Sequence, residues 1–235
     1  MCTITFVPKS NGNFVLTSNR DEAPGRETFS PKLYIEEGLK LVYPKDAVAG
    51  GTWIGVSEKK RVVCLMNGGF VAHKRHSFYI KSRGLVVKDL LKTENLKDEI
   101  SGYDFHEIEP FTVVIVEWRR EVVLFQLVWD GLKYHFSEEP LAPKIWSSSP
   151  LYPESLKKKR EHWFSEFLFE NISPSDKEIL EFHKTAGEGD LKSNLIMDRG
   201  FIKTKSITQL NRLNETVEMR YEDLQLGTIN TTFFS

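Results

Sequence analysis

Apolar and polar residues alternate with a period of two at the start of the chain. The alternation covers residues 2–7, and residues 14–17 resume as a second strand-forming segment after the turn-forming residues Asn11-Gly12-Asn13. Two strand-forming segments joined by Asn and Gly are typical of a β-hairpin. The sequence therefore predicts an N-terminal hairpin. Residues 19–29 are polar and include a proline and a glycine, so they are predicted to form a loop.

The same reasoning places elements along the rest of the chain. Helical spacing of apolar residues predicts helices at 82–91, 153–169 and 175–183, the last capped by Ser173 or Ser175. Strands are predicted in residues 50–56, 62–66, 112–117, 121–129 and 145–147, at Ile196, and in residues 201–210 and 215–221. Strands and helices do not alternate regularly, which favours antiparallel sheets with helices packed outside them, an α+β layered fold. No repeat or linker divides the chain, so a single domain over residues 1–235 is expected.

Composition narrows the classes of function. The 235 residues are 40% hydrophobic, which is enough for a sizeable core. Lys and Arg total 32 against 33 Asp and Glu, so the net charge of the chain does not indicate binding to nucleic acid or to an anionic membrane. The expected partner is a small molecule, with no prediction of the oligomeric state. The basic run Lys157-Lys158-Lys159-Arg160 is interpreted as a solvated helix face.

The number of cysteines indicates the cellular compartment in which the protein is expected. Cys2 and Cys64 are the two cysteines of the sequence, which is too few for a secreted disulfide framework. No signal-like segment and no apolar run near the ~18 residues of a membrane span are visible. A cytoplasmic protein without a membrane span is expected, and Cys64 is interpreted as a core residue.

Cys2 directly follows Met1, and initiator methionine is generally removed before a small residue. The processed residue would carry both a thiol, with a pKa near ~8.5, and an α-amine, with a pKa near ~8. The amine could then take the proton of the thiol, so that one residue is both nucleophile and base. Alternatively, Cys2 is an ordinary small apolar residue at the start of a strand.

A polar cluster, Asn19-Arg20-Asp21-Glu22, directly follows the second hairpin strand. The hairpin returns this cluster to the side of Cys2. Asp21 could hold a terminal ammonium, and Arg20 or Asn19 could bind a substrate carboxylate or oxyanion. The alternative interpretation is a solvated turn.

These motifs resemble a known family. Met1-Cys2-Thr3-Ile4 and Ser18-Asn19-Arg20-Asp21-Glu22 are similar to the NRDE family, also called the transport and Golgi organisation protein 2 family. Further matches are Gly51-Thr52-Trp53-Ile54-Gly55, Asn67-Gly68-Gly69, Phe182-His183 before Ala186-Gly187, and Lys203-Thr204-Lys205-Ser206-Ile207-Thr208. The resemblance implies an N-terminal-nucleophile hydrolase-like fold, a four-layer αββα sandwich of two antiparallel sheets flanked by helices.

The resemblance extends more distantly to choloylglycine hydrolases and penicillin V acylases, which cleave linear amides. It implies that Cys2 is the nucleophile, that Asp21 positions its amine and that Asn67 donates to the oxyanion. Three positions depart from that pattern. Ser18 stands where those enzymes have an arginine, Ser148 where they have a second asparagine, and Lys205 where they have a late arginine, whose bidentate fork lysine lacks.

Two functions follow as hypotheses. The first is a cysteine hydrolase of small linear amides or esters, without a cofactor. The second, which the resemblance to the family implies, is a non-catalytic binding or trafficking protein with a haem, lipid or Golgi-related role. Axial ligands of haem iron would then come from Cys2, His73, His76 or His183. Trp53 either floors the ligand pocket or is buried in the core. No metal site is predicted, because His73 and His76 lack a third ligand in a recognised spacing.

Overall fold

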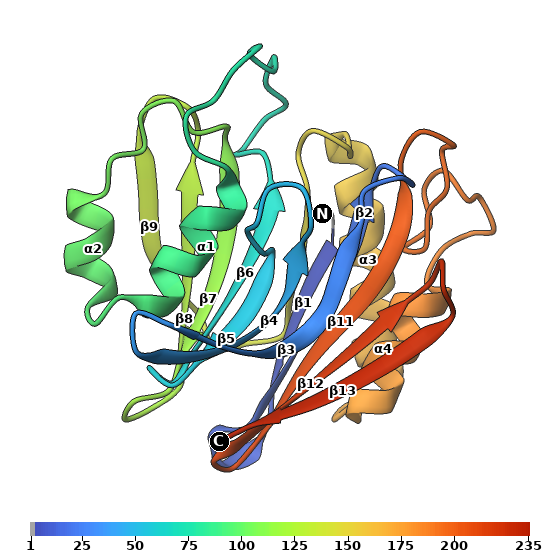
Figure 1. Ribbon diagram of the computed structural model, residues 1–235. Helices are drawn as coiled ribbons and strands as arrows, with labels where there is room; N and C mark the ends of the chain where they lie inside the picture. Colours follow the sequence, from blue (N-terminus) through green and yellow to red (C-terminus); the bar gives the residue numbers. More distant parts are fainter. Residues whose placement is uncertain (1–2) are drawn as a thin grey trace. The chain divides into compact units, whose positions relative to one another are not determined.

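A computed structural model describes residues 3–235 and contains two compact units (Figure 1). The first unit comprises residues 3–26, 142–147 and 151–235, and the second comprises Glu27–Leu141 and Ser148–Pro150. Both units are discontinuous in sequence. A single domain over the whole chain therefore stays a prediction.

The first unit is built on a six-stranded antiparallel sheet with the order β10-β1-β2-β11-β12-β13. Its strands are β1 (Thr3–Pro8), β2 (Phe14–Glu22), β10 (Lys144–Ser147), β11 (Lys203–Leu213), β12 (Thr216–Asp223) and β13 (Thr228–Phe234). The predicted N-terminal hairpin is confirmed as β1 and β2, joined by the 3₁₀ turn η1 (Ser10–Gly12). Asn11 and Gly12 adopt positive φ values of 56° and 71° there, which these residue types tolerate best.

Two helices, α3 (Glu154–Glu170) and α4 (Asp176–Thr185), pack against this sheet (Figure 1). Val7 and Val15 of the sheet form one apolar cluster with Phe164, Ile179 and Phe182 of the helices. Ser175 caps α4 in a capping box with Glu178, which confirms one of its two predicted caps.

The second unit is built on a seven-stranded antiparallel sheet with the order β3-β4-β5-β6-β7-β8-β9. Its strands are β3 (Thr28–Glu36), β4 (Leu39–Asp46), β5 (Ile54–Ser57), β6 (Arg61–Asn67), β7 (Phe111–Glu117), β8 (Val123–Trp129) and β9 (Tyr134–Glu139). Helix α1 (Arg83–Lys92) packs on β5 and β6, and α2 (Leu96–Gly102) follows it. Gly51 lets α1 approach, because a Cβ there would lie 2.5 Å from the backbone of Gly84.

The predicted fold class is confirmed: two antiparallel sheets carry flanking helices. The sequence nevertheless missed β3, β4, β9, α2 and β13, and Ile196 lies outside every strand. Strands β3, β9 and β13 are sheet edges whose residues are largely exposed, so they lack a clear alternation of apolar residues. No helix among residues 3–235 is long and apolar enough to cross a membrane.

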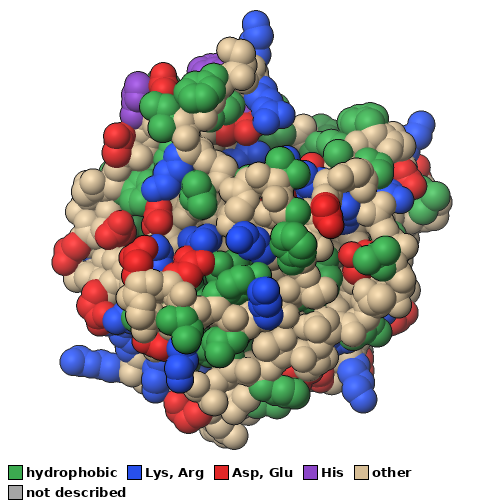
Figure 2. All heavy atoms as spheres, in the orientation of Figure 1, with side chains coloured by type: hydrophobic (Ala, Val, Ile, Leu, Met, Phe, Trp, Pro, Cys, Tyr) green, Lys and Arg blue, Asp and Glu red, His purple; other side chains and the backbone are tan. Residues whose placement is uncertain are grey.

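Two local predictions are corrected. Asn19-Arg20-Asp21-Glu22 belongs to β2 rather than to a loop, because the strand is paired on both sides and its polar side chains find buried partners. Arg160 is fully buried, so the basic run is not uniformly a solvated face. On the face visible in Figure 2, basic and acidic side chains are interspersed.

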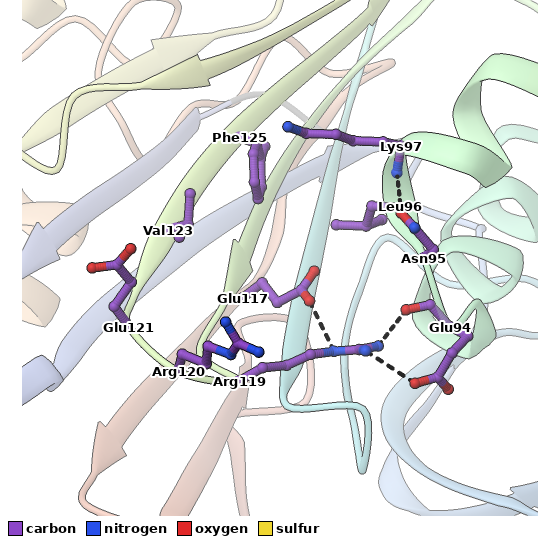
Figure 3. Close-up of a pocket in the computed structure, with 10 residues that line it drawn as sticks. All are labelled: Glu94, Asn95, Leu96, Lys97, Glu117, Arg119, Arg120, Glu121, Val123 and Phe125. Carbon is purple, nitrogen blue, oxygen red and sulfur yellow. Dashed lines mark hydrogen bonds and ion pairs between the residues drawn. The ribbon is translucent and has the colours of Figure 1, made fainter.

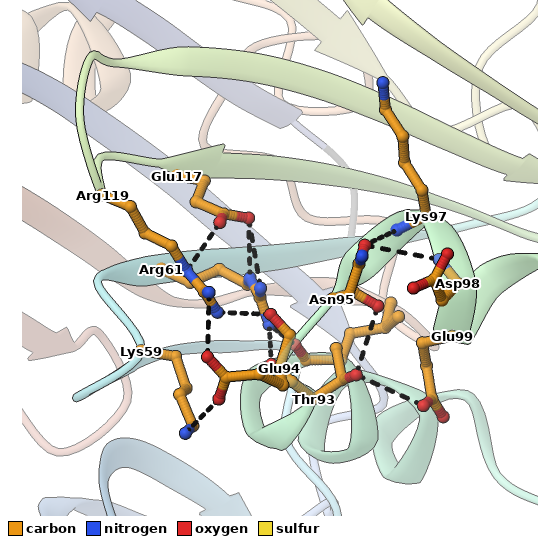
Figure 4. A network of polar contacts seen from close by, with 11 residues as sticks. Lys59, Arg61, Thr93, Glu94, Asn95, Lys97, Asp98, Glu99, Glu117 and Arg119 are labelled. Carbon is orange, nitrogen blue, oxygen red and sulfur yellow. Dashed lines mark hydrogen bonds and ion pairs between the residues drawn. The ribbon is translucent and has the colours of Figure 1, made fainter.

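A buried arginine joins α1 to the second sheet (Figure 4). The guanidinium of Arg61 donates to the carbonyls of Leu90 and Thr93 at 2.7 Å each, and it pairs with the carboxylate of Glu117 at 3.1 Å. Leu90 and Thr93 lie at the end of α1, where helix carbonyls lack partners within the helix. Arg119 bridges Glu117 and Glu94 beside it, and a groove of about 490 Å³ opens along this network (Figure 3).

We expect Arg61→Ala to lower the free energy of unfolding by about 3–5 kcal/mol, because it leaves two helix carbonyls without their buried donor and removes one of the two arginines that pair with the partly buried carboxylate of Glu117. Arg120→Ala, on the exposed turn between β7 and β8, should change it by less than about 0.5 kcal/mol. Urea unfolding of the two variants makes the comparison. Equal effects would contradict the role given to Arg61.

Candidate functional site

Asp21 is a buried acidic side chain of the first unit. It lies near the end of β2 and is 2% exposed. One carboxylate oxygen accepts a hydrogen bond from the hydroxyl of Thr204 at 2.6 Å, and the other accepts one from the hydroxyl of Tyr152 at 2.7 Å. Thr204 faces Asp21 across the β2–β11 pair, and Tyr152 lies just before α3. Two separate segments therefore fix the orientation of this carboxylate.

Asn19 points to the same face of the sheet as Asp21, two residues away. Its amide nitrogen donates to the carbonyls of His183 and Leu195 at 3.1 and 3.0 Å. Its amide oxygen therefore faces His183 Nδ1 at 2.7 Å, so that nitrogen carries the proton. His183 Nε2 is left to accept from the hydroxyl of Thr5 at 2.7 Å. The polar groups of Asn19 are thus used within the protein, and this side chain acts on the site by positioning β2.

His183 is neutral in this network. Its burial, and secondly the positive charge of Arg160, lower its pKa to about 3. A charged imidazole carries a proton on both ring nitrogens. Nε2 could then no longer accept the hydrogen bond that the Thr5 hydroxyl donates. The histidine therefore acts as a fixed hydrogen-bonding link between α4 and the first two strands.

Arg160 contacts Thr3, the first residue that the structure describes. Its guanidinium donates to the hydroxyl of Thr3 at 2.6 Å and to the carbonyls of Ser193 and Asn194 at 3.0 and 2.8 Å. It also stacks 3.6 Å from the centre of the Tyr152 ring, a cation–π contact. Tyr152 in turn holds Asp21, so one helix side chain supports both β1 and the acidic residue.

The opposite face of the same strand carries Ser18 and Arg20. Ser18 is fully buried, and its hydroxyl has no hydrogen-bond partner among residues 3–235. Thr208, directly across the β2–β11 pair, has the same two properties. Arg20 is 3% exposed and lies 3.8 Å from the carboxylate of Glu22.

Cys2 lies outside the residues that the structure describes. Its neighbour Thr3 begins β1 and pairs with Asn19 of β2. The strand that carries Asp21 is therefore the hydrogen-bonded neighbour of the strand that begins directly after Cys2.

Asn67 belongs to the second unit and is the last residue of β6. Its carbonyl accepts a hydrogen bond from the hydroxyl of Ser148 at 2.9 Å, and its own side chain makes no hydrogen bond among the described residues. The next residue, Gly68, has a φ of +83°, and a Cβ there would lie 2.2 Å from the ring of Pro150. The structure thus brings Asn67 and Ser148 together, in a tight turn packed on a proline.

Two predicted binding residues have structural contacts of their own. The ammonium of Lys205 donates to the carbonyls of Pro24 and Arg26, at a bulge of β11. Burial, and secondly the charge of Arg20, lower its pKa. Trp53 is 2% exposed and Cys64 is fully buried, as expected of core residues.

The three histidines considered for haem differ in availability. Both ring nitrogens of His183 are hydrogen-bonded, so this residue could bind iron only if the network broke. His73 Nε2 lies 3.3 Å from the carboxylate of Glu109, and the ring of His76 stacks on Tyr79. The contacts of His183 therefore weigh against it as an axial ligand.

Sequence reasoning missed Tyr152, Thr204 and Arg160. Arg160 had a detectable signal, because it precedes Phe164 by four residues and Phe167 by seven and so shares the apolar face of the helix. Tyr152 and Thr204 gave no comparable signal, since their function depends on a contact with a residue more than a hundred positions away.

The chain is similar to a known protein family. The sequence profile of the family described as Transport and Golgi organisation 2 matches residues 1–129. Comparison with the sequences of curated proteins gave no match.

Three solved structures with the same fold carry the names of enzymes and have low sequence identity to this chain. A variant of conjugated bile acid hydrolase from Clostridium perfringens is 9% identical, with a TM-score of 0.63 over 98% of this chain and 92% of that chain. Penicillin V acylase from Agrobacterium tumefaciens is 9% identical, with a TM-score of 0.61 over 100% and 86%. The Caenorhabditis elegans orthologue of N-acylethanolamine-hydrolyzing acid amidase is 14% identical, with a TM-score of 0.60 over 89% and 92%. They show that the fold is that of the N-terminal-nucleophile hydrolases.

Because His183 is neutral when folded, acid should destabilise the protein through this residue. The unfolded histidine takes up a proton below pH ~6.5, whereas the folded one stays neutral down to a pKa of about 3. Its contribution is fully present above pH ~6.5 and is lost at up to about 1.4 kcal/mol per pH unit on acidification between those limits.

Urea unfolding at pH 7, 6 and 5 tests this expectation. The difference in unfolding free energy between wild type and His183→Gln should shrink as the pH falls. For Ser165→Ala, an exposed position of α3 that carries no titratable group, the difference should stay constant. A constant difference for His183→Gln as well would show that this histidine does not titrate as described.

Proposed function

The chain belongs to the Transport and Golgi organisation 2 family, and we propose that it is a cysteine N-terminal-nucleophile hydrolase of small linear amides or esters. In this proposal Cys2 is the nucleophile, and its α-amine is the base once Met1 has been removed. The observation that carries the proposal is the buried Asp21 carboxylate, which two hydroxyls hold in place. Asp21 lies on β2, the strand that pairs with the one directly after Cys2.

The physical reason is charge balance. When the thiol gives its proton to the α-amine, a thiolate and an ammonium form together. A nearby carboxylate stabilises that ammonium, and a carboxylate whose oxygens are already oriented reorganises little when the charge appears. Thr204 and Tyr152 supply the orientation, and Arg160 holds the hydroxyl of Thr3.

The proposed reaction has two steps. The Cys2 thiolate attacks the carbonyl carbon, the side chain of Asn67 donates to the resulting oxyanion, and the leaving amine or alcohol takes the proton from the α-ammonium. Water then attacks the thioester, the α-amine accepts its proton, and the carboxylic acid leaves as the thiol is restored. The role of Asn67 comes from the resemblance to bile acid hydrolases and acylases. Its side chain, which makes no other hydrogen bond among the described residues, suits that role.

Three residues proposed to act near the substrate differ in type from those at the matching positions of bile acid hydrolases and acylases. Ser18 offers a buried hydroxyl with no partner among the described residues, which suits a polar group of the substrate. Lys205 donates to two loop carbonyls, so we assign it to holding residues 24–26 and, through them, the end of β2. Ser148 is assigned to support Asn67.

We expect a small thiol-reactive electrophile at neutral pH to form one fast adduct, measured by intact-protein mass. The adduct should form on a chain that lacks Met1, and Cys2→Ala should abolish it. The fully buried Cys64 should stay unmodified in the folded protein and so serves as an internal control. Retention of Met1, or equal reactivity of both cysteines, would contradict the mechanism and favour the binding or trafficking alternative.

Asp21→Asn should slow adduct formation about tenfold, the effect of a shift of one pKa unit in the thiol–amine pair. The matched control Asp98→Asn removes an exposed carboxylate of α2 and should leave the rate unchanged. Circular dichroism of both variants checks that they are folded. If folded Asp21→Asn reacts at the wild-type rate, Asp21 does not stabilise the ammonium.

A further inference from the structure

A groove runs along the seam between α3 and α4, and none of the candidate hydrolase residues lines it. Its volume is about 450 Å³. On each helix the lining residues recur at intervals of three and four, so one face of each helix forms one wall. The lining residues are Trp163, Glu166, Phe167, Glu170, Asn171, Glu178, Glu181, Phe182, Thr185, Ala186 and Gly187.

The floor of the groove is aromatic. Trp163 and Phe167 are half-buried and pack on the apolar cluster beneath the helices, and Phe182 is 6% exposed. The rings of Phe167 and Phe182 lie 4.9 Å apart, one from each helix. At the end of the groove, Ile172 follows the lining residue Asn171 and is 96% exposed. An apolar floor that stays open to solvent is a common feature of docking sites.

The rim of the groove is acidic. It carries Glu166, Glu170, Glu178 and Glu181, and no Lys or Arg lines the groove. Glu170 and Glu181, which lie on opposite walls, have no ion-pair partner among residues 3–235. The occupant that complements this groove is therefore apolar along its centre and positively charged on both flanks.

We propose that the groove docks a basic amphipathic helix of a partner protein. The walls are two straight helices, and the lined part of α3, residues 163–170, spans about 10 Å, or two helical turns. A partner helix with apolar residues at i, i+3 or i+4, and i+7 places them on the aromatic floor. Its flanking Lys and Arg then lie beside the glutamates of each wall.

The probe is a synthetic 14-residue helical peptide with Leu at those positions and Lys or Arg on both flanks. Its control is a peptide of the same composition, scrambled so that Leu and Lys share every face. We measure binding by fluorescence anisotropy of the labelled peptides. The wild-type protein should bind the amphipathic peptide at least about tenfold more tightly than the scrambled one, because only the former has a continuous apolar face.

Variants of exposed glutamates separate the groove from the general charge of the protein. Glu170→Gln with Glu181→Gln should weaken binding of the amphipathic peptide about fivefold to tenfold, through the loss of two ion pairs. Glu154→Gln with Glu161→Gln removes the same charge from exposed positions of α3 outside the groove, and binding should stay at the wild-type level. All four positions are exposed, so both double variants are expected to fold.

Three results would overturn the proposal. The first is equal binding of the scrambled peptide, and the second is equal weakening by both pairs of variants, since either would indicate unspecific attraction to an acidic surface. The third is a dimer, seen by light scattering, that the groove variants dissociate, which would make the occupant a second copy of this chain. The proposal is independent of the chemistry at Cys2, which none of these variants touches.

Discussion

The burial of the Asp21 carboxylate is the constraint on which the first unit depends. A carboxylate that is removed from water needs hydrogen-bond donors, and those donors come from Thr204 on a neighbouring strand and Tyr152 before α3. Each donor is itself held, Thr204 by the backbone amide of Met197 and Tyr152 by the guanidinium of Arg160 stacked on its ring. The need to satisfy one charge therefore fixes segments that lie far apart in the sequence.

The surroundings of Asp21 divide the helix-covered face of the sheet into two parts. Towards the hairpin turn, Val7 and Val15 meet Phe164 and Ile179 in an apolar cluster. Towards the other end of the strands, Asn19, His183 and Arg160 form a polar layer in which most groups are matched. The neutral state of His183 belongs to this arrangement, because burial, and secondly the positive charge of Arg160, lower its pKa. The polar layer backs the end of the strands where the candidate chemistry lies, and the apolar part holds the helices in place.

The same helices have an outer side with a different character. Phe164 packs inward in the cluster that contains Val7 and Val15. Trp163 and Phe167 line the groove, whose other lining residues include four glutamates. A helix pair that faces a sheet on one side and solvent on the other needs only one apolar face. Trp163 and Phe167 pack on the apolar cluster and yet stay half-buried where they line the groove, and this partial exposure gives the groove its aromatic floor.

The sequence by itself determined the N-terminal hairpin, α1, α3 and α4, a cap of α4 at Ser173 or Ser175 and the α+β class, because these features depend on periodicity and on contacts a few residues long. The motifs around Cys2 and Asp21 also identified the family. Residues 19–22 were misassigned to a loop, since their polarity is that of a turn, and only pairing with β1 and β11 makes them a strand. The partners of Asp21, the burial of Arg160 and the neutrality of His183 were decided by the tertiary structure alone. The hydrogen bonds of Asp21 join residues more than a hundred positions apart, and the state of Arg160 and His183 follows from their removal from water. Local sequence records neither long-range contacts nor burial.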